Sequence, residues 1–254
     1  MNNKTKIALV TGGSRGLGRD MALRLAEKGL NVILTYNNRV EDAGRVVAQI
    51  EAAGHQAALL QLNTGAIQSF GSFVDQLKAT LGDHFGADHL DFLINNAGQG
   101  GYKPISEVTE EFFDDLLNVH FKGVYFLTQR LLPLINDGGG IVNISSGLTR
   151  TSMPGSSVYA SLKTAVETFT RYLAKEYGSR GIRANVVAPG AIMTDFGGGR
   201  LRNSEEIQKA ISGITALGRP GVAEDIGGVI AFLCTDDARW VNGQRIEVSG
   251  GMNV

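Results

Sequence analysis

The sequence predicts an α/β fold, a single doubly wound domain with a central parallel β-sheet of about seven strands and helices on both faces. Two observations predict it. Short apolar runs alternate with longer stretches of helical periodicity from one end of the chain to the other. The apolar runs are continuous, which is typical of parallel strands buried on both faces and joined by right-handed crossovers.

The first half of the chain contains four predicted strands. They are apolar runs such as KIALVT and NVILTY, at residues 6–11, 31–36, 56–62 and 90–95. Helical periodicity fills the intervals between them, at residues 16–28, 40–53 and 66–81. Strands that alternate with helices in this way indicate βαβ units.

The second half begins with a long predicted helix over residues 110–135. Thr109 precedes it as a plausible N-cap, because a hydroxyl accepts hydrogen bonds from the free amides of a first turn. The remaining strands are predicted at 140–145, 182–187 and 244–248, and the remaining helices at 158–177 and 223–233. No repeat or linker divides the chain, so one domain is expected over residues 1–254.

Composition and charge narrow the class of protein. With 43% hydrophobic residues the chain can fill a sizeable core, and a net charge of −1 leaves no excess to hold nucleic acid or an anionic membrane. The single cysteine, Cys234, excludes an intrachain disulfide and a cysteine-cluster metal site, and no metal is expected. No stretch reaches the ~18 apolar residues of a membrane span, and residues 1–10 lack a signal-peptide core. A soluble, cytoplasmic protein is therefore expected.

A glycine-rich turn, TGGSRGLG at residues 11–18, separates the first strand from the first helix. Its spacing, G-x-x-x-G-x-G, differs from the dinucleotide-binding fingerprint G-x-G-x-x-G. The physical requirement is the same, because glycines let the backbone approach a pyrophosphate that faces the helix N-terminus. An ordinary strand–turn–helix connection has a similar pattern, so the turn alone leaves both interpretations open.

The end of the second strand favours a phosphate over a hydroxyl. A Rossmann-type site for NAD has an acid there, which binds the ribose hydroxyls. Here Tyr36 occupies the position, Asn37 and Arg39 follow, and Arg15 lies in the glycine turn. Lone arginines are commonly solvated surface charges, but the missing acid carries more weight. NADP(H) is therefore predicted in preference to NAD(H).

Tyr159 and Lys163 begin a predicted helix and lie four residues apart on one face, in the segment YASLK. A tyrosine needs its pKa depressed from about 10 to act as an acid or base at neutral pH. A neighbouring ammonium, together with an oxidised nicotinamide, favours the phenolate. Taken alone the pair is a weak signal, because such pairs often decorate helix surfaces.

Read together, the motifs resemble those of one family. TGGSRGLG at 11–18, NNAG at 95–98, Asn118 in LNVHFKG, NISS ending at Ser146, YASLK at 159–163 and PG at 189–190 follow the order and spacing of the short-chain dehydrogenases/reductases. The resemblance covers nearly the whole chain, and its nearest subgroup is the 3-oxoacyl-[acyl-carrier-protein] reductases and related carbonyl reductases.

The resemblance implies a catalytic set. Tyr159 would be the general acid in reduction and the general base in oxidation. Lys163 would hold the nicotinamide ribose and lower the tyrosine pKa, and Ser146 would hydrogen-bond the substrate oxygen. Asn118 would anchor a water that relays protons to Lys163. His120 is expected to be a packed helix residue, and Ser145 to face away from Ser146.

The resemblance also implies the cofactor contacts. Asn96, Ala97 and Gly98 would line the adenosine ribose, Asn63 would meet the adenine, and Ile192 and Thr194 the carboxamide, with Asn95 bracing the sheet. The full expected set, beyond Tyr159 and Lys163, is Gly12, Ser14, Arg15, Gly16, Leu17, Gly18, Tyr36, Asn37, Arg39, Asn63, Thr64, Asn96, Ala97, Gly98, Pro189, Gly190, Ile192 and Thr194.

The family builds its substrate lid at about residues 190–218, where three consecutive glycines, 197–199, give a pliable stretch. Leu148, Met153 and Phe196 would form an apolar wall. A free small carbonyl compound or secondary alcohol is the expected substrate. A reductase of acyl-carrier-protein thioesters is the alternative, although only Arg180 remains near the expected dock of an acidic carrier protein.

Three other functions are weighed against this one. A non-catalytic NADP-binding redox sensor has no need of Ser146, Tyr159, Lys163 and Asn118 together. A methyltransferase shares the sheet topology but explains neither YASLK nor NNAG, and a serine hydrolase lacks the G-x-S-x-G elbow. The family also pairs its two long helices across a two-fold axis, so a homotetramer is expected.

Overall fold

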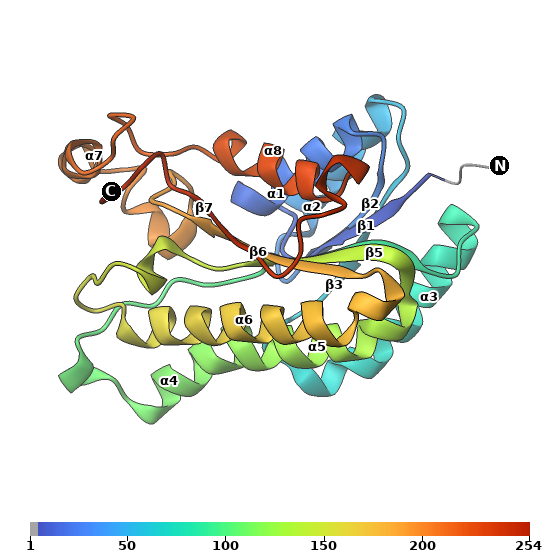
Figure 1. Ribbon diagram of the computed structural model, residues 1–254, viewed down its shortest axis with the longest axis horizontal. Coiled ribbons are helices and arrows are strands. Elements are labelled where there is room, and N and C mark those ends of the chain that lie inside the picture. The colour runs from blue at the N-terminus through green and yellow to red at the C-terminus, as the bar shows by residue number, and fades with distance from the viewer. Residues whose placement is uncertain (1–4) are drawn as a thin grey trace.

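The computed structural model describes residues 5–254 and contains one seven-stranded sheet, in which every neighbouring pair is parallel (Figure 1). The strand order is β3-β2-β1-β4-β5-β6-β7. The strands are β1 (Ile7–Val10), β2 (Asn31–Tyr36), β3 (Ala57–Gln61), β4 (Leu90–Asn95), β5 (Ile135–Ile144), β6 (Arg183–Pro189) and β7 (Arg245–Val248). The predicted fold class is confirmed. The order reverses between β1 and β4, where sheets of this kind bind ligands.

Successive residues of the central strands enter two separate cores. On β1, Ala8 and Val10 pack with α1 (Gly16–Glu27), α2 (Val40–Ala52) and α8 (Glu224–Leu233). Ile7 and Leu9 face the other side, with α3 (Phe70–Phe85), α5 (Gly123–Leu131) and α6 (Ser157–Glu176). Figure 1 shows the two helix layers on opposite faces of the sheet. The period-2 alternation of a strand explains why its apolar run is continuous.

The prediction of one continuous helix over 110–135 is wrong. It consists of α4 (Glu110–Leu117), a π-helical turn at Asn118–Lys122, α5, and a 3₁₀ turn at Leu132–Leu134 that contains Pro133. Thr109 caps α4 as predicted, because its side chain accepts a hydrogen bond from the Phe112 amide at 3.2 Å. Strand β5 begins at Ile135, five residues before the predicted start, because Asn136–Gly139 carries no apolar pattern.

The predicted lid segment, 190–218, contains a short helix that periodicity did not reveal, α7 (Glu205–Gly213). The Ser204 hydroxyl caps it by accepting from the Ile207 amide at 3.3 Å. The expected helix over 66–81 begins instead with a 3₁₀ turn and continues as α3 to Phe85. Over residues 5–254, none of the helices combines the length and the apolar character that crossing a membrane requires.

Candidate active site

The glycine turn after β1 is closely packed against its own backbone. A methyl group in place of the Gly18 hydrogen would lie 2.2 Å from the carbonyl oxygen of Gly12, so only glycine fits there. A methyl group on Gly12 would lie 3.0 Å from the Cα of Ala97. The turn therefore lies against the NNAG segment after β4, as the resemblance implies.

The two asparagines of that segment have structural bonds. The Asn96 side-chain amide donates to the carbonyl oxygens of Thr11 and Gly12, at 2.8 and 3.2 Å, and so clamps the glycine turn. Asn95 donates to Thr128 and Asn143 at 2.9 and 2.8 Å, and braces β4 against β5 and α5. The bracing role expected for Asn95 is confirmed.

The arginines expected to meet a 2′-phosphate line a common hollow of about 290 Å³, together with Ser14, Gly16 and Asp195. In the protein alone each is paired with a carboxylate. Arg39 lies 3.3 Å from Asp42, and Arg15 lies 3.5 Å from Asp195. Both arginine side chains stay about half exposed, so these ion pairs are weak and open to exchange for an anion.

The other predicted cofactor residues lie at the carboxyl ends of the strands. Tyr36 ends β2, and the Asn37 carbonyl accepts a hydrogen bond from Gln61 at 2.9 Å. The Asn63 side chain accepts from the Gly65 amide at 2.9 Å, within its own loop. Of the remainder, Leu17 lies in the first turn of α1, Thr64 follows β3, Gly98 follows β4, and Pro189, Gly190, Ile192 and Thr194 lie at the end of β6 and just after it. A methyl group on Gly16 would lie 3.6 Å from Thr194, so the lid base faces the glycine turn.

Helix α6 and the end of β5 bring Tyr159, Lys163 and Ser146 together. The Lys163 ammonium is buried, donates to the carbonyl oxygen of Ile144 at 2.7 Å, and lies 5.7 Å from the centre of the Tyr159 ring. The Ser146 hydroxyl accepts from the Leu148 amide at 3.2 Å, so its own proton is free to be donated. Its neighbour Ser145 bonds to Glu167 at 2.6 Å, on the other face of the strand, as predicted.

Burial governs the protonation of this pair in the protein alone. Burial raises the pKa of Tyr159 to about 12, and the hydrogen bond with Ser146 lowers it by a smaller amount. Burial also lowers the pKa of Lys163 to about 8. The depression of the tyrosine pKa expected from Lys163 is therefore absent here, because desolvation of the phenolate outweighs the neighbouring groups. At neutral pH the phenol keeps its proton, as the acid in a reduction must.

The expectation that His120 is a packed helix residue is confirmed, and the structure places its ring against Tyr159. It is fully buried on the π-helical turn, and its ring stands edge-on to the Tyr159 ring, with centroids 5.0 Å apart. Its Nε2 lies 2.7 Å from the Gln99 carbonyl oxygen, so an Nε2–H tautomer donates a hydrogen bond to that oxygen. Its Nδ1 has no hydrogen-bond partner within residues 5–254. Burial, and then the charge of Lys163, lower the pKa of His120 to about 3.

Asn118 lies on the same turn, half-buried, and two residues before His120. Its backbone carbonyl accepts from the Gly123 amide, at the end of the π-helical turn. In the part of the chain that the structure describes, its side chain makes no hydrogen bond to Tyr159 or Lys163. The π-helical turn sets which residue faces Tyr159, and sequence periodicity contains no signal for such a turn.

The loops after β4, β5 and β6 carry half-exposed apolar side chains. The Phe196 ring, in the predicted lid segment after β6, lies 5.9 Å from the Tyr159 ring and is 50% exposed. Tyr102 covers Gly155, just before α6, and the Arg200 guanidinium lies 5.5 Å from the Tyr102 ring centre. Met153 is exposed to the same degree as Phe196. Gly197, in the predicted lid segment, lies close to Gly100. A methyl group on Gly100 would lie 2.5 Å from the Cα of Gly197.

These residues fit an NADP(H) molecule. Gly18 leaves no room for a side chain in the turn after β1, and two arginines with exchangeable partners border the hollow beside it. Arg15 and Arg39 would hold the 2′-phosphate, the glycine turn the pyrophosphate, and Lys163 the nicotinamide ribose.

Comparison with known proteins agrees with this fit. The model of a family described as enoyl-(acyl carrier protein) reductase matches residues 12–253. The hydroxynaphthalene reductase-like protein Arp2 of Metarhizium brunneum is 37% identical, with 97% of this chain and 94% of that protein covered. The hydroxynaphthalene reductase arp2 of Aspergillus fumigatus is 35% identical, with 94% of this chain and 89% of that protein covered.

Two solved structures extend the similarity to the whole backbone. The angucycline C-6 ketoreductase LanV, solved with bound NADP, has a TM-score of 0.93 and 36% identity, with 99% of this chain and 97% of that chain covered. The reductase LugOII, which catalyses keto-reduction at C1 during lugdunomycin biosynthesis, has a TM-score of 0.93 and 37% identity over the full length of both chains. This chain belongs to the short-chain dehydrogenase/reductase family.

Proposed function

We propose that this enzyme reduces a ketone carried on a planar, fused-ring compound, with NADPH as the hydride donor. The observation that carries the proposal is the Phe196 ring, which is half exposed and lies 5.9 Å from the Tyr159 ring. A half-exposed aromatic ring beside the acid favours a flat apolar ligand, since offset and edge-on ring pairs contribute about 0.5–1.5 kcal/mol beyond their buried area. The loops after β4 and β5 add the half-exposed side chains of Tyr102 and Met153.

The reaction class and cofactor predicted from the sequence are confirmed. The relatives are reductases of carbonyl groups, and several of the solved ones contain NADP or NADPH. The protein is an NADP(H)-dependent oxidoreductase that acts on C=O or CH–OH groups. NADP(H) supplies or accepts the hydride when bound.

The arrangement of the side chains supports the following roles. Ser146 donates its free proton in a hydrogen bond to the substrate oxygen, which orients the carbonyl. Tyr159 transfers its phenolic proton to that oxygen as the alcohol forms. Lys163 holds the nicotinamide ribose, and its ammonium, 5.7 Å from the Tyr159 ring centre, favours the phenolate that remains once NADP(H) is bound. The catalytic set expected from the resemblance also contains Asn118, whereas the ring contact with Tyr159 favours His120 as the neighbour of the acid.

The substrate class also agrees with the names of the relatives. Two of them are hydroxynaphthalene reductases or similar to one, and LanV has been solved with rabelomycin as well as NADP. The alternative, an acyl-carrier-protein reductase, has less support. Arg180, the basic residue available for docking an acidic carrier, is bound to Asp137 and to the carbonyls of Leu132 and Ile135.

A panel of ketones tests this proposal. NADPH oxidation is followed at 340 nm with 2-tetralone as a fused bicyclic ketone, cyclohexanone as a single ring, and an acetoacetyl thioester as the acyl substrate. We expect kcat/KM for the bicyclic ketone to exceed that for cyclohexanone by about two- to tenfold, from one added ring contact. A higher kcat/KM for the thioester would overturn the proposal in favour of the acyl reductase.

The remaining features of this proposal concern the lid, the assembly and the location. Residues 190–218 act as the lid, with the glycines at 197–199 as its pliable part. The enzyme assembles as a homotetramer, supported by the rings of Tyr125, Phe126 and Tyr172, which α5 and α6 leave 36–63% exposed. A cytoplasmic location suits the free thiol of Cys234. Light scattering at micromolar concentration tests the assembly, and a mass of one chain would contradict it.

A further inference from the structure

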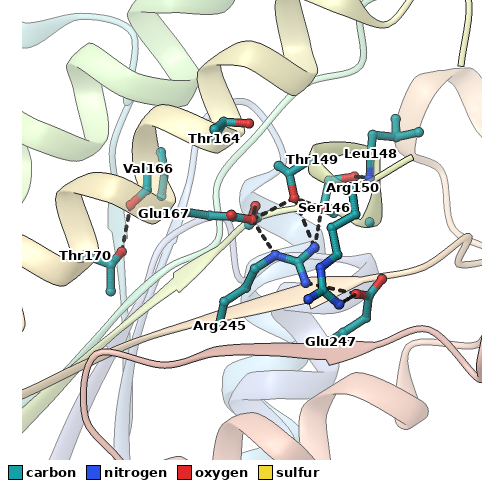
Figure 2. A network of polar contacts seen from close by, with 12 residues as sticks. Ser146, Leu148, Thr149, Arg150, Thr164, Val166, Glu167, Thr170, Arg245 and Glu247 are labelled. Carbon is teal, nitrogen blue, oxygen red and sulfur yellow. Dashed lines mark hydrogen bonds and ion pairs between the residues drawn. The ribbon is translucent and has the colours of Figure 1, made fainter. Parts of the chain in front are cut away.

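A polar network lies directly behind Ser146 and joins α6 to β7 (Figure 2). Its centre is the carboxylate of Glu167, which is only 9% exposed. One oxygen of this carboxylate accepts from the Ser145 hydroxyl at 2.6 Å and from the Arg245 guanidinium at 2.8 Å, and lies 2.8 Å from the Thr149 hydroxyl. The network therefore links the residues on both sides of Ser146 in the sequence to one buried charge.

The same network holds the backbone of Ser146. Arg245 donates through Nη2 to the Ser146 carbonyl oxygen at 3.3 Å and to the Thr149 hydroxyl at 3.0 Å. The Thr149 hydroxyl and amide lie 3.0 and 3.2 Å from that carbonyl oxygen. Three groups thus converge on the peptide carbonyl of the residue whose hydroxyl faces Tyr159. Because these contacts are directional, they fix the rotation of this peptide.

The outer end of the network reaches the surface. Arg245 also pairs with Glu247 at 2.9 Å, and Glu247 pairs with Arg150 at 3.0 Å. A buried ion pair is no more stabilising than a well-packed apolar pair, so stability alone does not account for it. What apolar side chains cannot supply is a set of hydrogen bonds aimed at one carbonyl oxygen.

We propose that Glu167 and Arg245 are positioning residues for the reaction, which fix the Ser146 peptide so that the serine hydroxyl meets the substrate oxygen. This inference rests on the role of Ser146 in the proposed function. Neither side chain touches the reacting atoms, so their effect on turnover passes through Ser146.

The other end of the same strand offers a matched control. Arg180 pairs with Asp137 at 2.7 Å and donates to the carbonyl oxygens of Leu132 and Ile135 at 3.1 and 2.6 Å. It is therefore an arginine that joins a carboxylate and backbone carbonyls at the start of β5, far along the strand from Ser146. Arg180→Met reports what the loss of such a clamp does to stability alone.

The experiment compares Glu167→Gln, Arg245→Met, Arg245→Lys and Arg180→Met for kcat, KM, NADPH affinity and melting temperature. We expect Glu167→Gln and Arg245→Met to lower kcat about tenfold or more, as small displacements of an oriented group do, with NADPH affinity within about twofold. Arg245→Lys should recover part of the loss, and Arg180→Met should lower the melting temperature while keeping kcat. If Glu167→Gln or Arg245→Met fails to fold, Thr149→Val replaces it in the comparison. This variant removes one hydroxyl of the network and keeps the side-chain shape, and we expect it to lower kcat as well.

The double variant Ser146→Ala/Glu167→Gln decides between positioning and general damage. If Glu167 acts through Ser146, the double variant turns over no more slowly than Ser146→Ala alone. Additive losses, unchanged kcat in Glu167→Gln, or an equal loss in Arg180→Met would each overturn the inference. If Ser146→Ala itself keeps full turnover, the proposed role of Ser146 fails instead, and the two failures are thereby distinguished.

Discussion

The Arg15 guanidinium of the glycine turn lies 3.5 Å from the Asp195 carboxylate at the base of the lid segment. Asp195 also pairs with Arg202, further along that segment. One carboxylate therefore joins the residue expected to bind the 2′-phosphate to the residues expected to cover the substrate. Both side chains are partly exposed, so the pair contributes about 0–1 kcal/mol, less than a charge-assisted phosphate contact.

The first prediction concerns cofactor choice. Arg15→Ala should weaken NADPH binding about ten- to a hundredfold and leave NADH binding nearly unchanged, because a charge-assisted bond contributes roughly 1.5–3 kcal/mol. Tyr36→Asp should shift preference toward NADH, since a carboxylate repels the 2′-phosphate. Fluorescence titration of both cofactors measures the effect, with the exposed Arg171→Ala as the control. Equal affinities of the unmodified enzyme for NADPH and NADH would contradict this prediction.

The second prediction concerns the partner of Arg15. Asp195→Asn removes a negative charge beside the expected phosphate and frees Arg15, so NADPH should bind about two- to fivefold more tightly, in line with the small energy of an exposed ion pair. NADH, which lacks the phosphate, should bind as before. The same titration checks both values, and a weaker NADPH complex would show that Asp195 supports the site.

The third prediction concerns the acid. Tyr159→Phe removes the phenolic proton and keeps the ring against His120 and Phe196. Turnover should fall by several hundredfold or more, the upper range for a lost general acid, while NADPH affinity is retained. Single-turnover absorbance at 340 nm checks the chemical step separately from binding. Near-normal turnover in this variant would rule out Tyr159 as the acid.

The sheet and its ligand-binding edge are predictable because both rest on local patterns. Continuous apolar runs gave the strands, and the glycine turn marked the edge where Gly12 meets Ala97. The break in the helix over 110–135 is not predictable in this way. At the end of the π-helical turn Gly123 lies against the Thr64 carbonyl oxygen, where a methyl group would be 2.0 Å away. Contacts between distant segments of this kind leave no periodic trace in the sequence.

In the site, too, local patterns predict some of the residues, and contacts between distant segments place the others. Tyr159 and Lys163 are neighbours on one helix, so their spacing alone predicts that they share a face. Glu167 and Arg245 are 78 residues apart, and only the pairing of β5, β6 and β7 brings them together behind Ser146. The position of His120 depends on the π-helical turn, which rotates the residues after Asn118 relative to a regular helix.

The fourth prediction separates the two polar residues of that turn. His120→Ala removes the ring that packs edge-on against Tyr159 and the bond to Gln99, so kcat should fall about tenfold or more while NADPH affinity is kept. Asn118→Ala should have the smaller effect on kcat, because its side chain lacks a contact with Tyr159 among the described residues. Steady-state kinetics on both variants checks the order. A larger loss in Asn118→Ala would support the water-mediated proton relay that the family resemblance assigns to Asn118.

The last prediction follows from the buried, neutral state of His120. Its pKa is about 3 in the folded protein and 6.5 in an unfolded chain, so between these values the unfolded state binds the extra proton. Stability must therefore fall as the pH falls below 6.5, by about 1.4 kcal/mol for each pH unit from this group alone. His120→Asn removes this term, so the stability difference between the unmodified enzyme and the variant should shrink by about 2 kcal/mol between pH 7.5 and pH 5. Urea unfolding at the two pH values measures it, with His89→Asn as the matched substitution of an exposed histidine. A pH-independent difference for His120→Asn would mean that burial leaves the pKa of His120 at its unfolded value.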